Sequence, residues 1–510
     1  MLVQDNTSMN SFDIQLTEQA RKDIFEQNHP DLKNIIVKLL SDQSFDEITL
    51  HEQVNWLFDS FQAVVNYGLN NAEVVKSLVE YHAGRIFSSP ELNLSDACRL
   101  LEAIHGLNWV GAVSLFDMRG YNRAGVQPFY HYLKQTQNRS KICTSLHHQN
   151  QAENLNIVYM IHYADVNRGN ALGPMMKDLI INHTQQSVFN ITCFCVQWAD
   201  QRYIDELVSA GVRVRVIPQE ISYKRLDELK QVLGEFNPDV IISDVASPVA
   251  TWLYSQRVAR LQMYLDPGYP HWNIPELDWV LLPGKSFQSG FDIPRNRASS
   301  VRITITDQVF PHIQDASINI SDDFEYSFGL FTRLVKVNSE LLHIINELME
   351  ILPEAKLLIV GSGNSDLITN WLSDSRFTAR VTFINYMVEL QCYKDKVKIF
   401  LDTFPFVGGL ACREMMSYGI PVVSMLAGEW DELLKEQRDL TTLASSHTEY
   451  IQIACKLYSD HTYYDEARKK SSQLANKHND PSIMIMDIEN GIKQAIASLD
   501  LRELKQKLNG

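Results

Sequence analysis

The sequence predicts an α/β protein in which an all-helical segment precedes two doubly wound, largely parallel sheets. From about residue 12 to residue 140, apolar residues recur at helical spacing, with few runs typical of strands. Beyond residue 150, short apolar runs alternate with helical patterns in two successive sets. We therefore expect three domains, one helical and two with sheets, over residues 1–150, 151–315 and 316–510.

The helical domain is predicted from the spacing of its apolar residues. Val54, Leu57, Phe58 and Phe61 stand at positions i, i+3, i+4 and i+7, which share one face of a helix. The sequence has no fixed period of about 34 residues, so a regular array of helical repeats is not expected. Polar residues from Gln135 to Glu153 indicate a linker to the first sheet domain.

Each sheet domain is predicted from a series of short apolar runs. The first set of strands is expected at residues 157–161, 189–194, 212–217 and 240–242. The second set is expected at residues 328–331, 356–361, 381–384, 399–402 and 421–425. Two such Rossmann-like halves would form a natural ligand site in the cleft between them. The chain is expected to end in one or two helices between Ile483 and Leu508.

Charge and composition disfavour several kinds of partner. The 510 residues include 46 Lys and Arg against 62 Asp and Glu, a formal net charge of −16, so nucleic acid is not expected as a partner. Neither an apolar run long enough to span a membrane nor a basic and apolar signal peptide is present, so we expect a cytoplasmic protein without a membrane span. The seven cysteines form no CxxC pair and predict reduced core thiols.

Common hydrolase and metal signatures are also missing from the sequence. It contains no Gly-x-Ser-x-Gly elbow, no His-Glu-x-x-His helix and no Walker lysine loop. No Asp-x-Asp triplet stands at the end of a predicted strand. We therefore expect neither a metal nor a cofactor.

The segment best suited to phosphate binding follows the predicted strand that ends at Asp402. Four residues open a helix there: Gly408, Gly409, Leu410 and Ala411. Backbone N–H groups at the start of a helix, with the helix dipole behind them, favour a diphosphate. Glu414 lies about one turn further on, where a carboxylate could accept both hydroxyls of a ribose. A plain strand-to-helix turn is the alternative explanation of the glycines.

A lysine after another strand could complete this site. Lys336 follows the predicted strand at 328–331, with Arg333 as its neighbour. A lysine ammonium is a compact charge that can neutralise a leaving nucleotide diphosphate without a metal. Lys336 is therefore the first candidate for that role, and a lysine on a solvated helix start is the alternative.

These motifs resemble the C-terminal half of GT-B glycosyltransferases, and more narrowly the group that contains O-GlcNAc transferase and the bacterial asparagine N-glucosyltransferases. The resemblance covers about residues 155–460. It rests on Leu401–Phe406, the glycine-bearing loop, the acid at 414, Gly419-Ile420-Pro421 and the segment 331–338. The chain departs from the group at Glu414, where the group usually has Asp, and at 408–411, where the group has a turn rich in Thr and Asn.

The resemblance also implies an acceptor side in the first sheet domain. The group places a catalytic histidine after the first strand, near the place where this chain has Gly169 and Asn170. Asp165 and His162, at the end of that strand, are the two remaining candidates for the base. A Gly-Tyr-Pro element follows another strand, and the resemblance implies an acceptor or sugar pocket formed by Asn170, Gly268, Tyr269 and His271. A rigid turn is the alternative reading of that element.

The resemblance implies an inverting glycosyltransferase. Its donor substrate would be a UDP-sugar, from which it moves a hexose or N-acetylhexosamine to the side chain of an acceptor protein or peptide. The missing histidine keeps a second hypothesis open, a non-catalytic GT-B partner of another glycosyltransferase. A third hypothesis is another GT-B enzyme, which either builds a polysaccharide or epimerises a nucleotide sugar.

Overall fold

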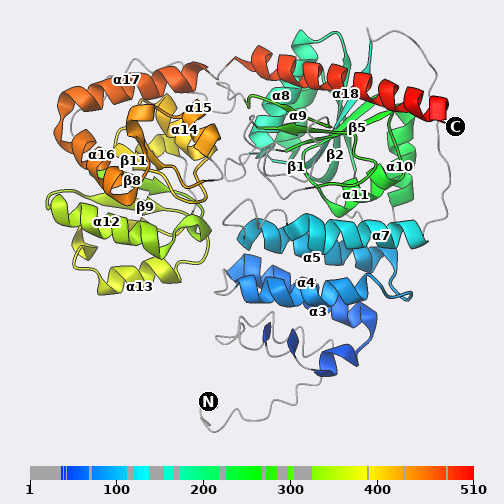
Figure 1. The fold of residues 1–510 in the computed structure, drawn as a ribbon, viewed down its shortest axis with the longest axis horizontal. Helices are drawn as coiled ribbons and strands as arrows, with labels where there is room; N and C mark the ends of the chain where they lie inside the picture. The colour runs from blue at the N-terminus through cyan, green and yellow to red at the C-terminus, as the bar shows by residue number, and fades with distance from the viewer. Residues whose placement is uncertain are drawn as a thin grey trace.

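The computed structural model has a helical layer and two sheet domains (Figure 1). It describes residues 36–37, 40–41, 43–67, 72–111, 120–136, 154–165, 172–217, 226–266, 272–283, 297–303, 324–386, 390–428, 431–477 and 480–509. The helical layer lies beneath the first sheet domain in this view, and the second sheet domain lies beside the first. The predicted linker was Gln135 to Glu153. Gln135 and Thr136 belong to a helix, and residues 137–153 lie outside the described residues.

The described part of the first domain is helical, as predicted. Its main helices are α3 (Leu50–Tyr67), α4 (Ala72–Ile86), α5 (Leu94–Gly111) and α7 (Gln127–Thr136), with a short π-helix at Asn122–Val126. Apolar residues of these helices, among them Trp56, Leu57 and Phe129, are buried in a shared core. Helices α5 and α7 also contact α11 (Pro248–Ser255), so the helical layer packs directly on the first sheet domain.

The first sheet has seven strands in the order β3-β2-β1-β4-β5-β6-β7, and every neighbouring pair is parallel. The strands are β1 (Asn156–Ala164), β2 (Asn190–Ala199), β3 (Arg213–Val216), β4 (Val240–Ser243), β5 (Leu261–Leu265), β6 (Trp279–Leu282) and β7 (Ala298–Ser300). Helices α8 (Leu172–Gln186), α9 (Gln201–Ser209) and α10 (Leu226–Glu235) connect the first strands. All four predicted strands of this domain are found, and the carboxyl ends of parallel strands form one edge where ligands bind.

The second sheet has six parallel strands in the order β10-β9-β8-β11-β12-β13. The strands are β8 (Tyr326–Phe331), β9 (Leu357–Val360), β10 (Val381–Ile384), β11 (Val397–Leu401), β12 (Val422–Met425) and β13 (Leu443–Ala444). The helices are α12 (Ser339–Ile351), α13 (Asp366–Asp374), α14 (Leu410–Ser417), α15 (Asp431–Gln437), α16 (His447–Ser459) and α17 (His461–Lys477). The strands predicted for this domain are all present.

The last helix, α18 (Pro481–Asn509), returns to the first sheet domain, where Figure 1 shows it crossing the top of that domain. Ile485, Ile488 and Ile492 share the core of the first sheet. A Cβ on Gly491 would lie 2.6 Å from Leu281 Cδ2, so the helix and the sheet approach closely there. The helix α18 therefore packs on the first sheet domain. The sequence analysis had included it in the second sheet domain, for which we expected residues 316–510.

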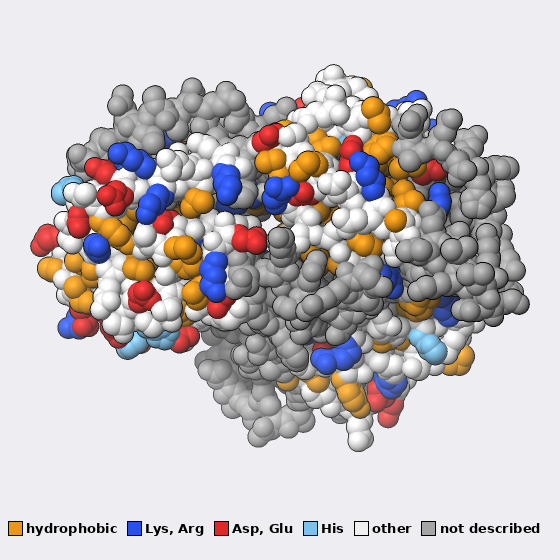
Figure 2. All heavy atoms as spheres, turned by 45° about the horizontal axis from the view of Figure 1, so that its top comes forward, with side chains coloured by type: hydrophobic (Ala, Val, Ile, Leu, Met, Phe, Trp, Pro, Cys, Tyr) orange, Lys and Arg blue, Asp and Glu red, His pale blue; other side chains and the backbone are white. Residues whose placement is uncertain are grey.

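The surface carries both signs of charge. On the face shown in Figure 2, Lys and Arg side chains are interspersed with Asp and Glu. In the part of the chain that the structure describes, no helix has both the length and the apolar character needed to cross a membrane.

Candidate functional site

One buried carboxylate organises the loop after β11. Asp402 is 1% exposed. Its Oδ1 accepts hydrogen bonds from the backbone N–H groups of Thr403 at 2.8 Å and Gly408 at 2.6 Å. Its Oδ2 accepts a hydrogen bond from Ser424 Oγ at 2.7 Å, and its carbonyl oxygen accepts one from the Tyr450 hydroxyl at 3.0 Å. These bonds hold the loop in one shape up to the start of α14.

The turn predicted to bind phosphate is the N-terminus of α14, with Gly409 as the N-cap. The first N–H groups of a helix have no partner within the helix. Around a Cβ placed on Gly409 there is no atom within 4 Å, so the backbone borders open space. The amides of Gly409, Leu410 and Ala411 are therefore in the position that the sequence predicted.

Gly408 departs from that expectation, because its N–H donates to Asp402 instead of pointing to a ligand. A Cβ at this position would lie 2.6 Å from Cys412 Sγ and 2.8 Å from Asp402 Oδ1. Only glycine fits there without a shift of these groups. The role of Gly408 is thus to let the loop close around Asp402.

Glu414 lies one turn into α14 and is buried. Its Oε1 accepts a hydrogen bond from the Tyr418 hydroxyl at 3.0 Å. The spacing of four residues brings these two side chains together on one helix face. Tyr418 is a functional candidate that we did not predict, and this spacing was the signal for it. The tyrosine fixes the orientation of the carboxylate expected to meet a ribose.

Lys336 and the loop after β11 are brought together. Lys336 ends the short 3₁₀ helix Leu334–Lys336, which Arg333 precedes. Its Nζ donates to the carbonyl oxygen of Val407 at 2.9 Å and lies 4.2 Å from the ring centre of Phe406. Burial, with the charge of Arg333 in addition, lowers the pKa of Lys336 to about 7, although Asp402 acts in the opposite direction. The ammonium therefore gains or loses its proton near neutral pH.

Two arginines that we did not predict lie beside the same loop. Arg438 follows α15 and is 3% exposed, and its Nη2 donates to the carbonyl oxygen of Gly408 at 2.7 Å. Arg413 on α14 donates from Nη1 to the carbonyl oxygen of Ile303 at 2.6 Å, which links the site to the first sheet domain. Burial, together with the charge of Arg438, lowers the pKa of Arg413 to about 9. Two cationic side chains, Lys336 and Arg438, thus donate to carbonyl oxygens of the loop that Asp402 organises.

On the side of the first sheet, His162 is not placed as a base. It is fully buried in β1. Its Nδ1 lies 2.8 Å from Asp244 Oδ1 and its Nε2 lies 2.5 Å from Ser247 Oγ. Ser247 Oγ also accepts a hydrogen bond from the backbone N–H of Ala250, at the start of α11. Both ring nitrogens are engaged in the core, so the expectation that His162 meets an acceptor is corrected, and its role is to tie β1 to the loop after β4.

Asp165 directly follows β1 at the carboxyl edge of the first sheet and is partly exposed. Of the two candidates for the base, it is therefore the one with access to solvent. The predicted acceptor or sugar pocket lies outside the described residues, and this applies to Asn170, Gly268, Tyr269 and His271.

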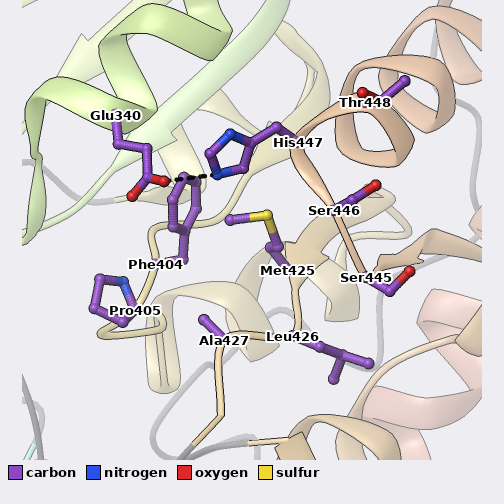
Figure 3. A pocket seen from close by; sticks show the side chains of 10 residues that line it. All are labelled: Glu340, Phe404, Pro405, Met425, Leu426, Ala427, Ser445, Ser446, His447 and Thr448. Atoms are coloured by element: carbon purple, nitrogen blue, oxygen red, sulfur yellow. Dashed lines mark ion pairs between the residues drawn. The ribbon is translucent and has the colours of Figure 1, made fainter.

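A pocket of about 560 Å³ opens at the carboxyl ends of β11, β12 and β13 (Figure 3). His447 and Glu340 form an ion pair at 2.8 Å on its border. Phe404 and Pro405, from the loop that Asp402 organises, contribute to its wall. Within the described ranges, no group of three His, Cys, Asp or Glu side chains is placed to hold a metal ion.

Comparison with known proteins places this site in a recognised domain. Residues 326–460 match the family model described as glycosyl transferases group 1, and this range contains Lys336, the loop after β11, Glu414 and Arg438. A search of curated protein sequences gives no significant match.

Three solved structures illustrate the similarity of fold. The structure of a Thermobaculum terrenum O-GlcNAc transferase mutant has a TM-score of 0.59 at 14% identity and covers 95% of this chain and 99% of that chain. Anabaena HepE in complex with UDP and glucose has a TM-score of 0.48 at 15% identity, with 66% and 99% covered. A glycosyltransferase from Rickettsia africae has a TM-score of 0.49 at 9% identity, with 67% and 99% covered. From the first of these, with its TM-score of 0.59, the chain has the fold of the GT-B glycosyltransferases, preceded by a helical domain. Its second sheet domain carries the match to glycosyl transferases group 1.

Proposed function

We propose that the protein is an inverting, metal-independent glycosyltransferase that moves a hexose or N-acetylhexosamine from a UDP-sugar to a protein side chain. The observation that carries the proposal is the contact of Lys336 Nζ with the loop that opens α14, 2.9 Å from the carbonyl oxygen of Val407. A lysine and a helix N-terminus that meet at one loop suit the charge of a diphosphate. The likeness of fold to a protein named O-GlcNAc transferase supports N-acetylhexosamine as the sugar.

The donor would lie at the carboxyl edge of the second sheet. Lys336 and the amides of Gly409 and Leu410, with that of Ala411, would bind the diphosphate, and Arg333 would add positive charge. Glu414, oriented by Tyr418, would accept hydrogen bonds from the ribose hydroxyls. These cations and amides would stabilise the negative charge that develops on the leaving UDP, a task that a metal performs in other enzymes.

The acceptor would approach from the first sheet domain. In an inverting transfer, the acceptor atom forms a bond to the anomeric carbon while the bond from that carbon to the diphosphate oxygen breaks. The acceptor proton would pass to Asp165, the partly exposed carboxylate after β1. Asn170, Gly268, Tyr269 and His271 remain proposed as the pocket for the acceptor or the sugar. The helical layer, which packs on α11, would help to bind the acceptor protein.

A second candidate function is that of a non-catalytic GT-B partner of another glycosyltransferase. The burial of His162 favours it, because both ring nitrogens are engaged with Asp244 and Ser247. Such a partner would bind a nucleotide sugar or a polypeptide without transferring the sugar. A polysaccharide-building GT-B enzyme is the remaining alternative.

The test is the intact mass of candidate acceptor proteins after incubation with a panel of nucleotide sugars. A mass increase of one hexose or one N-acetylhexosamine supports the proposal. Lys336→Met is expected to abolish the increase, whereas Lys356→Met, at an exposed position in the same domain, serves as the matched control. Donor binding without any mass increase would favour the non-catalytic partner, and a modified glycan with unmodified proteins would favour the polysaccharide enzyme.

A further inference from the structure

Arg438 is a buried guanidinium group that is only partly satisfied. Its side chain is 2% exposed. Nη2 donates to the carbonyl oxygen of Gly408 at 2.7 Å, whereas Nε and Nη1 are buried and have no hydrogen-bond partner among the residues that the structure describes. Buried polar groups are nearly always hydrogen-bonded, and a buried charge without partners is costly. Among the described residues, Nε and Nη1 of Arg438 therefore remain able to donate to a ligand.

The surroundings of Arg438 point to an anion. The nearest carboxylate oxygen, Oδ2 of Asp402, lies 3.9 Å from Nη2 and accepts its hydrogen bond from Ser424. A further cation, Lys336, donates to the neighbouring carbonyl oxygen of the same loop. Buried charges in proteins are normally paired, and a separation of 3.9 Å is too long for a hydrogen bond between Arg438 and Asp402. An anion that accepts hydrogen bonds from Nε and Nη1 would pair with the charge of Arg438.

The loop itself places this anion at the proposed donor site. Lys336 donates to the carbonyl oxygen of Val407, and Arg438 donates to that of the next residue, Gly408. The residue after these, Gly409, borders open space at the start of α14. The two cations and the helix N-terminus therefore belong to one stretch of three residues. A guanidinium group carries five N–H donors in one plane, so Nε and Nη1 can each meet a different phosphate oxygen while Nη2 holds Gly408, which a lysine cannot do.

We infer that Arg438 is a donor-binding residue, whose Nε and Nη1 donate to the diphosphate of the nucleotide sugar while its Nη2 holds Gly408. This inference rests on the proposed function, because it assumes that the donor occupies the loop after β11. Arg438 would distinguish diphosphate donors from uncharged nucleosides, and it would share the charge of the leaving group with Lys336.

The experiment measures the affinity of three probes by titration calorimetry and ligand-observed NMR: UDP, inorganic pyrophosphate and uridine. In Arg438→Gln, the affinities for UDP and pyrophosphate are expected to fall about 10- to 100-fold, as for the loss of hydrogen bonds to a charged group. The affinity for uridine is expected to stay within about twofold. Arg468→Gln is the matched control, because Arg468 on α17 also has two buried nitrogens without partners but lies against Tyr464.

The possible results distinguish a failure of the role of Arg438 from a failure of the proposed function. Equal losses for uridine and UDP, or an unchanged affinity for UDP and pyrophosphate, would overturn the role of Arg438 and leave the proposed function intact. A third result is that the parent binds pyrophosphate but not UDP, and that Arg438→Gln loses the affinity for pyrophosphate. That result would support the anion-binding role of Arg438 and contradict UDP as the nucleotide of the donor. A parent that binds neither probe would overturn both. If Arg438→Gln fails to fold, Arg438→Lys replaces it, because a lysine keeps the positive charge but lacks the planar set of N–H donors. An affinity of this variant for pyrophosphate below that of the parent would support the role of Arg438.

Discussion

The ammonium of Lys336 lies 2.9 Å from the carbonyl oxygen of Val407, and this contact joins the segment after β8 to the loop after β11. The two strands are neighbours in the sheet although the residues are 71 positions apart. The carboxyl ends of adjacent parallel strands meet at one edge, which is where GT-B and other doubly wound proteins bind nucleotides. The contact therefore marks the centre of the candidate donor site.

The first prediction concerns the pH dependence of donor binding. Burial, with Arg333 in addition, lowers the pKa of Lys336 to about 7, so the ammonium loses its proton as the pH rises through neutrality. The affinity for UDP is expected to decrease as the pH rises from 7 to 9, with proton uptake on binding in that range. Calorimetry in buffers of different ionisation enthalpy measures both quantities.

The matched variant for this pH dependence is Lys336→Arg, because a guanidinium keeps its charge over the whole range. Its affinity for UDP is expected to vary little between pH 7 and 9. Below pH 7, protonation of the terminal phosphate of UDP changes the affinity of both parent and variant. The same loss of affinity in parent and variant would show that another group is responsible.

The second prediction concerns Asp402. In Asp402→Asn, the remaining oxygen can still accept from the backbone N–H groups of Thr403 and Gly408. The amide nitrogen that replaces Oδ2 cannot accept from Ser424 Oγ, and the charge that faces Arg438 is removed. The free energy of unfolding is expected to fall by about 2–4 kcal/mol, which urea denaturation measures. Asp374→Asn, at an exposed position, is expected to change it by less than about 0.5 kcal/mol. Equal stability of the two variants would contradict the organising role of Asp402.

The third prediction separates the two candidates for the base. Asp165→Asn is expected to lower the rate of sugar transfer about 100-fold or more, because the acceptor proton loses its destination. The affinity for UDP and the thermal unfolding temperature should remain near those of the parent, since Asp165 is partly exposed and follows the end of β1. A variant that transfers sugar at the parental rate would remove Asp165 from the mechanism.

The fourth prediction concerns His162, whose loss should weaken the fold. His162→Leu leaves buried polar atoms of Asp244 and Ser247 without their partner, so the free energy of unfolding is expected to fall by about 2–4 kcal/mol. His343→Leu is the control, because its side chain is 70% exposed. A normal unfolding curve for His162→Leu, combined with lost activity, would restore His162 as a catalytic candidate.

The fifth prediction concerns the return of α18 to the first sheet domain. Gly491→Ala is expected to reduce stability by about 1–3 kcal/mol, because the added Cβ would lie 2.6 Å from Leu281 Cδ2. Gly234→Ala, in α10, adds the same group where nothing lies within 4 Å, and it should increase stability by up to about 1 kcal/mol. Similar effects of the two substitutions on thermal unfolding would indicate that α18 does not pack on β6.

The order of strands and helices was predictable because apolar periodicity is a local property of the chain. The strand at 356–361 and the helix start at Gly409 both follow from a few consecutive residues. The role of Gly408 and the burial of His162 were not predictable in this way. Asp244 and Ser247 are 82 and 85 positions from His162, and their contacts depend on how β1 and β4 pair.

Arg438 and α18 were missed for the same reason. Arg438 meets Gly408 across 30 positions, and no motif joins the two. The apolar residues of α18 predict a buried face but do not identify the sheet that covers it, and the close approach of Gly491 to Leu281 depends on residues far apart in the sequence. In contrast, Lys336 was predictable because both its strand and its charge could be identified from consecutive residues.

The most direct test of the account is a crystal structure of the protein with UDP bound. The account predicts that the diphosphate lies at the start of α14, within hydrogen-bond distance of Lys336 Nζ and of the amides of Leu410 and Ala411. UDP bound elsewhere, or a loop after β11 that remains empty at saturating UDP, would contradict it.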